Sequence, residues 1–188
     1  GVSYCAVCDG AFFKGEVLAV IGGGDAAVEE ADFLTRYAER VYIIHRRDQF
    51  RASRILQERA FANPKIEVVW NKIVTEIVGD GHKVSHLVLK DTTTGGVLNL
   101  TVGGVFVFIG FKPNTGLVHG HVKHDAAGYL ITDDRMMTSL PGLFAAGDVR
   151  SQLTRQITTA VGDATTAAIA VEKYVAALRE RDKAGVAS

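Results

Sequence analysis

A glycine-rich turn between an apolar run and a helical pattern constrains this chain most. The run Val17–Ile21 predicts a buried strand, and Gly22-Gly23-Gly24-Asp25 follows it at once. Apolar residues then recur with helical spacing over residues 26–37, and Val41–Ile44 is a second apolar run. Strand, turn, helix and strand within about 30 residues form a right-handed parallel crossover. The sequence therefore predicts an α/β fold with a parallel sheet.

The periodicity changes after this crossover. A helix over residues 50–61 is expected to stop at Asn63-Pro64, and residues 66–70 read as a third strand. Three alternating segments separated by turns rich in glycine, aspartate and threonine then predict an antiparallel meander, before a fully apolar strand. These segments are residues 73–78, 84–90 and 97–101, and the apolar strand is 105–109.

The turn over residues 110–115 is the best candidate for a domain boundary. We therefore expect two domains, residues 1–113 and residues 114–188. The second contains two short predicted strands and a long helix rich in alanine and threonine, followed by a polar tail that we expect to fray. The strands are residues 129–132 and 142–146, the helix is 156–178, and the tail begins at Arg179.

Composition excludes several classes of protein. Of 188 residues, 47% are hydrophobic, which is enough for a packed core, and the formal net charge is zero, which argues against nucleic-acid binding in bulk. No apolar run reaches the roughly 18 residues that a membrane span needs. Two cysteines cannot staple a disulfide-rich scaffold. The chain begins without Met and without a signal-peptide pattern, so we expect a processed chain or a piece of a longer one.

The first motif is Gly22-x-Gly24-x-x-Ala27, directly after a strand and opening a helix. Gly22 permits the tight turn, Gly24 lets a pyrophosphate approach the backbone, and Ala27 keeps helix and strand close. The helix amides supply the positive end for the anion, and Asp25 is a candidate cap beside it. The motif predicts dinucleotide binding; the alternative is a glycine turn with no ligand.

The second motif follows the second strand, where a protein selecting NAD places an acid for the ribose 2′-hydroxyl. Here His45-Arg46-Arg47 occupies that position, Arg51 follows, and the first acid after the arginines is Asp48. Guanidinium groups pair with a 2′-phosphate in fork geometry. The sequence therefore predicts NADP(H) rather than NAD(H); the alternative is a solvated basic turn.

The third motif, Cys5-Ala6-Val7-Cys8-Asp9, contains both cysteines of the chain. Two thiols at this spacing can cycle between dithiol and disulfide. Asp9 is a candidate acid or base for moving the thiol proton. A zinc site needs four ligands, and no second cysteine pair exists. The alternative is a pair of small buried hydrophobic residues.

Two weaker features lie in the second half. Three nearby histidines are more simply a solvated loop than a metal site, so we predict no metal: His119, His121 and His124. An acid after the apolar strand, in Gly147-Asp148, can bind a ribose- or ribitol-type hydroxyl, and a helix N-terminus at Arg155-Gln156-Ile157 can face an electron-rich ring. Their alternative is a turn and a packed helix.

In order and spacing, these motifs resemble the low-molecular-weight, flavin-dependent thioredoxin reductases, specifically their C-terminal two-thirds. The matching strings are Cys5-Ala-Val-Cys-Asp-Gly-Ala-Phe-Phe, Val20-Ile-Gly-Gly-Gly-Asp-Ala-Ala-Val-Glu-Glu-Ala, His45-Arg-Arg-Asp-Gln-Phe-Arg, Ile109-Gly-Phe-Lys-Pro-Asn-Thr, Phe144-Ala-Ala-Gly-Asp-Val and Arg155-Gln-Ile.

The resemblance implies a Rossmann-like NADPH domain followed by the second half of an FAD-binding domain. NADPH would reduce FAD, FAD the Cys5–Cys8 disulfide, and the dithiol thioredoxin, with Cys8 nearest the flavin and Asp9 serving as the acid. The glycine turn maps onto the pyrophosphate loop and the arginines onto the 2′-phosphate clamp. The FAD side comprises Gly147, Asp148, Arg155, Gln156 and Ile157.

The resemblance further implies a cytoplasmic homodimer with thioredoxin as partner, and no nucleic-acid or membrane partner. Family members begin with a second glycine fingerprint for FAD, which this sequence does not show before Cys5. We therefore expect an incomplete FAD site in these 188 residues. Two alternatives stay open: a flavoprotein that reduces a peroxidase, and an NADPH-binding module without activity.

Overall fold

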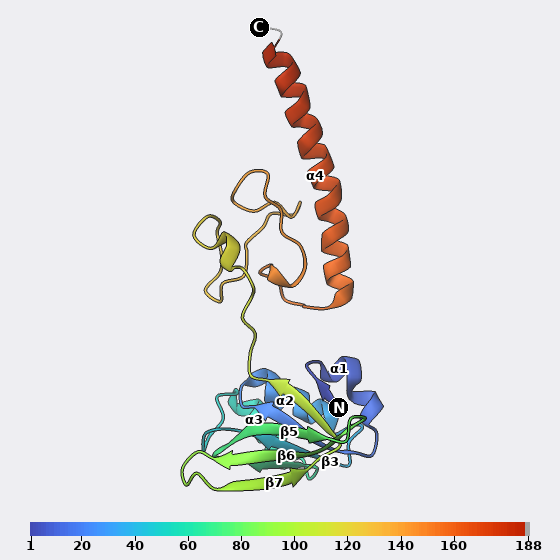
Figure 1. The fold of residues 1–188 in the computed structure, drawn as a ribbon, viewed down its shortest axis with the longest axis vertical. Helices are drawn as coiled ribbons and strands as arrows, with labels where there is room; N and C mark the ends of the chain where they lie inside the picture. Colours follow the sequence, from blue (N-terminus) through green and yellow to red (C-terminus); the bar gives the residue numbers. More distant parts are fainter. Residues whose placement is uncertain (187–188) are drawn as a thin grey trace. The chain divides into compact units, whose positions relative to one another are not determined.

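The computed structural model describes residues 1–186 and divides into two compact units, Gly1–Gly110 and the residues from Phe111 onward. Figure 1 colours unit 1 from blue to green and unit 2 from yellow to red. The division falls at Gly110, whose φ of +97° lies in the left-handed region that favours glycine.

The centre of unit 1 is a sheet of five parallel strands in the order β1-β8-β2-β3-β4. Strand β2 pairs on one side with β3, the next strand along the chain, and on the other with β8. The strand order therefore reverses at β2, and ligands of open α/β sheets bind at such a point, outside the carboxyl ends of the strands. The strands are β1 Val2–Ser3, β2 Val17–Gly22, β3 Arg40–Ile44, β4 Ile66–Val69 and β8 Gly104–Phe108.

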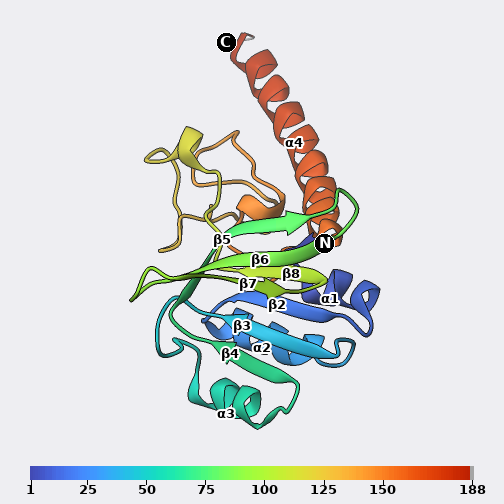
Figure 2. The same ribbon diagram turned by 60° about the horizontal axis from the view of Figure 1, so that its bottom comes forward.

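Both faces of this sheet are buried. Leu18 and Val20 pack on the side of the helices, and Ala19 packs on the opposite side against Leu87 and Leu89 of a second sheet. This second sheet is antiparallel, in the order β5-β6-β7 (Figure 2). Burial on both faces explains why β2 reads as an unbroken apolar run. The covering elements are α2 Asp25–Leu34, α3 Arg54–Ala62, β5 Lys72–Gly79, β6 Val84–Asp91 and β7 Val97–Thr101.

The predicted combination of a parallel sheet and an antiparallel meander is confirmed. The sequence did not indicate the short strand β1, or the helical turn α1 (Ala6–Asp9) and the 3-10 turn Gly10–Phe13 that follow it. A Cβ at Gly10 would lie 2.9 Å from the side chain of Leu34, so glycine lets this turn pack closely on α2. This contact holds the cysteine segment against α2.

Unit 2 has a small core of Val122, Leu130 and Ala145. The prediction of strands at residues 129–132 and 142–146 is wrong, because these segments form only isolated bridges, such as those joining Leu130 to Arg150 and Phe144 to Met137. A strand needs a neighbour along its length, and within the described residues these segments meet one at single positions.

The long helix of unit 2 is α4, Ile157–Val186. It continues from Arg179 to Val186, where we expected the tail to fray, and residues 187–188 of that tail lie outside the described part of the chain. Strong helix formers (Leu, Arg, Glu and Lys) dominate residues 178–183 and favour its continuation. The other elements of this unit are the 3-10 turns Gly116–Val118 and Gly147–Val149.

Candidate functional site

The two cysteines form a disulfide across the first turn of α1. The S–S distance between Cys5 and Cys8 is 2.02 Å and the Cα–Cα distance is 5.3 Å. Cys5 occupies the N-cap position, and its sulfur accepts a hydrogen bond of 3.1 Å from the backbone N–H of Cys8. Cys5 is half-buried and Cys8 is exposed. The alternative of two inert buried side chains is therefore wrong, because solvent reaches the disulfide.

Asp9 is held next to this pair by a residue that the sequence did not indicate. The hydroxyl of Ser3 donates a hydrogen bond of 2.6 Å to Oδ2 of Asp9 and accepts one of 3.1 Å from the backbone N–H of Cys5. Ser3 is buried in β1 and pairs with Phe106 of β8. The central sheet thereby positions the carboxylate and the disulfide together.

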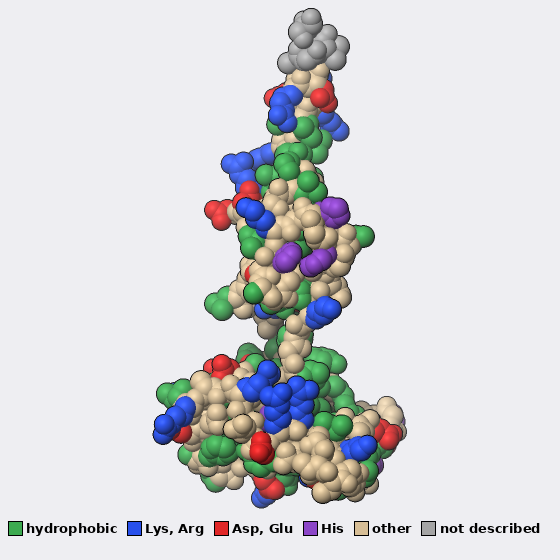
Figure 3. Space-filling model, turned by 90° about the vertical axis from the view of Figure 1, so that its left-hand side faces the viewer, with side chains coloured by type: hydrophobic (Ala, Val, Ile, Leu, Met, Phe, Trp, Pro, Cys, Tyr) green, Lys and Arg blue, Asp and Glu red, His purple; other side chains and the backbone are tan. Residues whose placement is uncertain are grey.

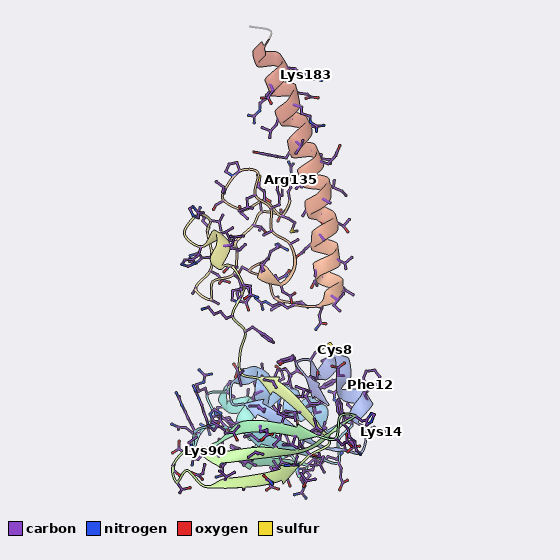
Figure 4. All side chains as sticks on the ribbon, viewed as in Figure 1. Cys8, Phe12, Lys14, Lys90, Arg135 and Lys183 are labelled. Carbon is purple, nitrogen blue, oxygen red and sulfur yellow. A yellow bond between two sulfur atoms is a disulfide. The ribbon has the colours of Figure 1, made fainter. Side chains whose placement is uncertain are left out.

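The surface around the disulfide is apolar. Tyr4, Val7 and Phe12 have exposed fractions of 62%, 68% and 84%. Figure 4 labels Cys8 on α1 and Phe12 on the turn that follows it, both at the same edge of unit 1. An exposed apolar group of this kind beside a reactive bond is suited to contact with another protein.

The glycine turn has different requirements at its two motif positions. A Cβ at Gly22 would lie 2.5 Å from the carbonyl oxygen of Phe108 and 2.6 Å from Cβ of Ala27, and its φ is +153°. Gly22 and Ala27 therefore allow β2, β8 and α2 to meet closely. A Cβ at Gly24 would meet nothing within 4 Å. Gly24 leaves open space at the start of α2, where a phosphate group can approach the amides.

The prediction that Asp25 caps α2 is wrong. The N-cap is Gly24, which has no side-chain cap, and Asp25 is the first residue of the helix. Its Oδ1 atom accepts a hydrogen bond of 2.6 Å from the backbone N–H of Ser53. This bond joins the start of α2 to the segment before α3. Asp25 therefore stabilises the position of the glycine turn without capping the helix.

His45 is buried against the glycine turn. A Cβ at Gly23 would lie 2.2 Å from Nδ1 of His45, so only glycine admits the ring here. Burial lowers the pKa of His45, and the positive charges of Arg47 and Arg51 lower this pKa further. The ring is therefore neutral at pH 7, and within the described chain its buried Nε2 atom has no hydrogen-bond partner.

Three arginines lie beside this turn with unpaired charges. Arg46, Arg47 and Arg51 are exposed, and within residues 1–186 none of them forms an ion pair. Arg51 is anchored through its backbone, whose N–H donates a hydrogen bond of 2.7 Å to the carbonyl of Gly23. On the face of unit 1 seen in Figure 3, Lys and Arg side chains gather in one patch.

A cavity of about 620 Å³ opens at the carboxyl ends of β2, β3 and β8, with β5 as a further wall. It brings together the glycine turn, His45 and two of the arginines with an apolar wall. Arg47 and the cysteines do not line it. The lining residues are Ile21, Gly22, Gly23, Ile44, His45, Arg46, Arg51, Lys72, Ile73, Val74, Thr75, Glu76, Ile77, Val107, Phe108 and Ile109.

In unit 2, the turn with Gly147 and Asp148 is fixed by a buried ion pair. Asp163 on α4 lies 2.7 Å from Arg150, with both side chains more than four-fifths buried, and Oδ2 of Asp163 also accepts a hydrogen bond of 3.0 Å from the N–H of Gly147. Gly147 has φ +77°, and the side chain of Asp148 is exposed. Arg150 and Asp163 could not be identified from the sequence, because their pairing depends on how α4 packs.

The other predicted residues of unit 2 lie at the start of α4. The guanidinium of Arg155 lies 3.8 Å above the ring of Tyr129, whereas Gln156 and Ile157 are exposed. Arg155 is therefore engaged by an aromatic ring, and its buried Nε has no hydrogen-bond partner in the described chain. Gln156 and Ile157 remain accessible at the first turn of the helix.

The histidines of unit 2 are exposed and appear in purple on its surface in Figure 3. The rings of His119 and His124 stack with centroids 5.0 Å apart. Residues 1–186 contain no group of three or more histidine, cysteine, aspartate or glutamate side chains that could hold a metal ion.

Comparison with known proteins adds to this geometry. Residues 1–164 match the family model described as "Pyridine nucleotide-disulphide oxidoreductase". The chain belongs to this family. Family membership agrees with an exposed disulfide and a dinucleotide-type turn in one unit.

Relatives within the family are similar over most of this chain. A thioredoxin reductase of Listeria monocytogenes is 53% identical over 180 residues, and one of Bacillus subtilis is 51% identical over 180 residues. These matches cover 96% of this chain and 56% and 57% of the two relatives, respectively. The chain thus spans little more than half the length of the curated relatives that it matches.

A solved structure agrees closely. The thioredoxin reductase of Streptococcus pyogenes has a TM-score of 0.87 and 52% identity, covering 94% of this chain and 58% of that chain. No helix within residues 1–186 combines the length and apolar character required to cross a membrane.

Proposed function

We propose that this chain carries the NADPH-binding and disulfide-bearing part of a thioredoxin reductase, which passes electrons from NADPH to its own disulfide and from there to thioredoxin. One observation carries the proposal: an exposed Cys5–Cys8 disulfide shares unit 1 with a dinucleotide-type turn and three unpaired arginines. The names of the relatives support thioredoxin as the partner.

In this proposal the glycine turn binds the pyrophosphate of NADPH through the amides at the start of α2, in the open space beside Gly24. Arg46, Arg47 and Arg51 bind the 2′-phosphate, because their charges have no protein partner. The neutral ring of His45 packs against Gly23 and adds no further positive charge to those of the three arginines. The apolar wall of the cavity, which includes Ile44 and Val107, accommodates the uncharged parts of the dinucleotide.

Residues of unit 2 fit one side of an FAD site. Asp148 presents a carboxylate suited to a sugar-type hydroxyl, and Gln156 and Ile157 are accessible at a helix N-terminus. The buried, unpartnered Nε of Arg155 is a further donor at this turn. When bound, FAD supplies the exchange between a two-electron hydride donor and a disulfide. We propose these residues as the part of the FAD site that this chain contributes.

The proposed reaction is a two-electron reduction of the disulfide by NADPH, followed by thiol–disulfide exchange with thioredoxin. NADPH gives up a hydride, and its two electrons together with protons convert the Cys5–Cys8 S–S bond into two thiols. One thiolate then attacks a sulfur of the thioredoxin disulfide, which forms a mixed disulfide and frees the other thioredoxin sulfur as a thiolate. The second thiolate of the pair attacks the mixed disulfide, restores the Cys5–Cys8 bond and releases the remaining thioredoxin sulfur, so that thioredoxin leaves as a dithiol after protonation. Asp9, positioned by Ser3, takes up and returns the thiol proton.

The first test is nucleotide binding by the 188-residue chain. Trp70 is the only tryptophan and lies 6.2 Å from the His45 ring, so energy transfer from Trp70 to the reduced nicotinamide reports binding. We expect NADPH to bind at least about ten-fold more tightly than NADH, because charge-assisted bonds to the 2′-phosphate are lost with NADH. Equal affinities would contradict the assignment of the arginines.

The second test concerns electron transfer. This chain replaces the matching 180 residues of the Listeria monocytogenes relative, and NADPH-dependent reduction of thioredoxin is measured with FAD present. We expect activity that Cys8→Ser abolishes, and retention of activity in Cys8→Ser would refute the role of the disulfide. Faster reduction of a peroxidase would favour a peroxidase-serving flavoprotein. NADPH binding without reduction of either partner would indicate a nucleotide-binding module. The homodimer and the cytoplasmic location remain predictions.

A further inference from the structure

The antiparallel sheet of unit 1 holds the segment that carries the arginines. Three successive carbonyl groups after β3 each accept one hydrogen bond from this sheet or its turn. The donors are Lys72 N–H to His45 (3.1 Å), Thr92 Oγ1 to Arg46 (3.3 Å) and Asn71 N–H to Arg47 (3.3 Å). The backbone at residues 45–47 is therefore fixed from outside the parallel sheet.

Several contacts hold the turn that supplies Thr92. Lys72 and Asp91 pair across β5 and β6 with an Nζ–Oδ2 distance of 2.6 Å, and their side chains are only 16% and 17% exposed. Oδ1 of Asp91 accepts hydrogen bonds of 2.8 Å from the N–H groups of Thr93 and Thr94. The backbone N–H of Thr92 donates to the carbonyl of Asn71 at 2.8 Å.

We propose that Thr92 is a positioning residue for recognition of the 2′-phosphate, and this inference rests on the proposed function. Of the three donors to residues 45–47, the Thr92 hydroxyl is the one that belongs to a side chain, so a substitution can remove it. It donates to the carbonyl of Arg46. The direction of the backbone at Arg46 determines where its long side chain can reach. Holding this backbone reduces the ordering that phosphate binding requires.

The effect is confined to one side of the arginine group. Arg51 is held by the carbonyl of Gly23 on the glycine turn, with no bond to the antiparallel sheet among its described contacts. Loss of the Thr92 hydroxyl therefore loosens Arg46 and leaves Arg51 in place. The 2′-phosphate is the part of NADPH that NADH lacks, so only NADPH binding should respond.

The experiment compares dissociation constants of NADPH and NADH for the full 188-residue chain, measured by energy transfer from Trp70. Thr92→Val removes the hydroxyl and keeps the shape. We expect it to weaken NADPH binding about three-fold, the effect of one modest hydrogen bond, and to leave NADH binding unchanged. Thr92→Ser keeps the donor and should restore the wild-type ratio.

The matched control is Thr94→Val in the same turn. The hydroxyl of Thr94 accepts a hydrogen bond from Gly96 and makes none to the arginine segment, so both affinities should match those of the wild type. A second measurement repeats Thr92→Val in an Arg46→Met background. If Thr92 acts through Arg46, its effect on NADPH affinity disappears there.

The inference is overturned if Thr92→Val leaves NADPH affinity unchanged, weakens NADPH and NADH equally, or keeps its full effect in the Arg46→Met background. These outcomes leave the proposed function standing, provided that the wild-type chain prefers NADPH. A wild-type chain that binds both nucleotides equally or neither of them refutes the proposed function and this inference together.

Discussion

The hydroxyl of Ser3 donates a hydrogen bond of 2.6 Å to Oδ2 of Asp9, joining the short edge strand β1 to the end of α1. Between the two residues lies most of the disulfide segment. The same hydroxyl accepts the backbone N–H of Cys5 at 3.1 Å. A single buried side chain thus links the sheet, the disulfide and the candidate acid.

Replacement of this hydroxyl should destabilise unit 1. In Ser3→Ala, the Asp9 carboxylate and the N–H of Cys5 lose a partner inside the protein, so we expect the free energy of unfolding to fall by about 1–2 kcal/mol. Urea unfolding followed by Trp70 fluorescence measures this change. Ser53→Ala is the matched control, because the Ser53 side chain makes no capping bond. Equal stability of the two variants would show that the hydrogen bonds of Ser3 make no net contribution to the free energy of unfolding.

Alanine at the two motif glycines should have different effects, on stability at Gly22 and on NADPH affinity at Gly24. Gly22→Ala forces a Cβ to within 2.5 Å of the Phe108 carbonyl, so we expect it to lower the free energy of unfolding by at least about 2 kcal/mol. Gly24→Ala meets no protein atom within 4 Å, so we expect a change in stability below about 1 kcal/mol. The Gly24 variant should instead lose at least about ten-fold in NADPH affinity, because its methyl group occupies the phosphate approach.

Unfolding and NADPH titration of both glycine variants check this contrast. The interpretation of the turn is wrong if Gly24→Ala binds NADPH as tightly as the wild type. It is also wrong if Gly22→Ala is as stable as the wild type.

His45 should make stability depend on pH. Because burial lowers its pKa in the folded state, the folded protein favours the neutral ring. The resulting stabilisation is present above the unfolded-state pKa of about 6.5 and is lost as the pH falls through the folded-state pKa. Urea unfolding between pH 8 and pH 5 should therefore show a steeper loss in the wild type than in His45→Gln. Parallel curves would contradict this role of His45.

A buried and an exposed ion pair of this chain should contribute different amounts to the free energy of unfolding. Asp163→Asn leaves the Arg150 cation largely buried without its carboxylate partner. We therefore expect the free energy of unfolding of unit 2 to fall by about 3–5 kcal/mol. Glu58→Gln removes the partner of Arg54 in an exposed pair and should cost less than about 0.5 kcal/mol. Denaturation followed by circular dichroism of the helices measures both. Similar values for the two variants would show that burial of the Arg150 pair has no effect.

The dinucleotide part of the site could be predicted from sequence because its signals are local. Gly22, Gly24 and the three arginines occur at fixed distances from strands whose apolar runs are visible in the chain. Ser3 and Thr92 could not be predicted, since a serine in a strand or a threonine in a turn has no special pattern. Their value arises from partners at Asp9 and Arg46, which only folding brings within hydrogen-bond distance.

The sequence by itself determined the order of strands and helices in unit 1, the tight turn at Gly22 and the positive charge after β3, because backbone freedom, apolar periodicity and charge are properties of neighbouring residues. The tertiary structure decided that Cys8 faces solvent, that two expected strands of unit 2 remain isolated bridges, and that Asp163 pairs with Arg150. Exposure, strand pairing and ion pairing each depend on a second segment of the chain, and its position follows only from packing.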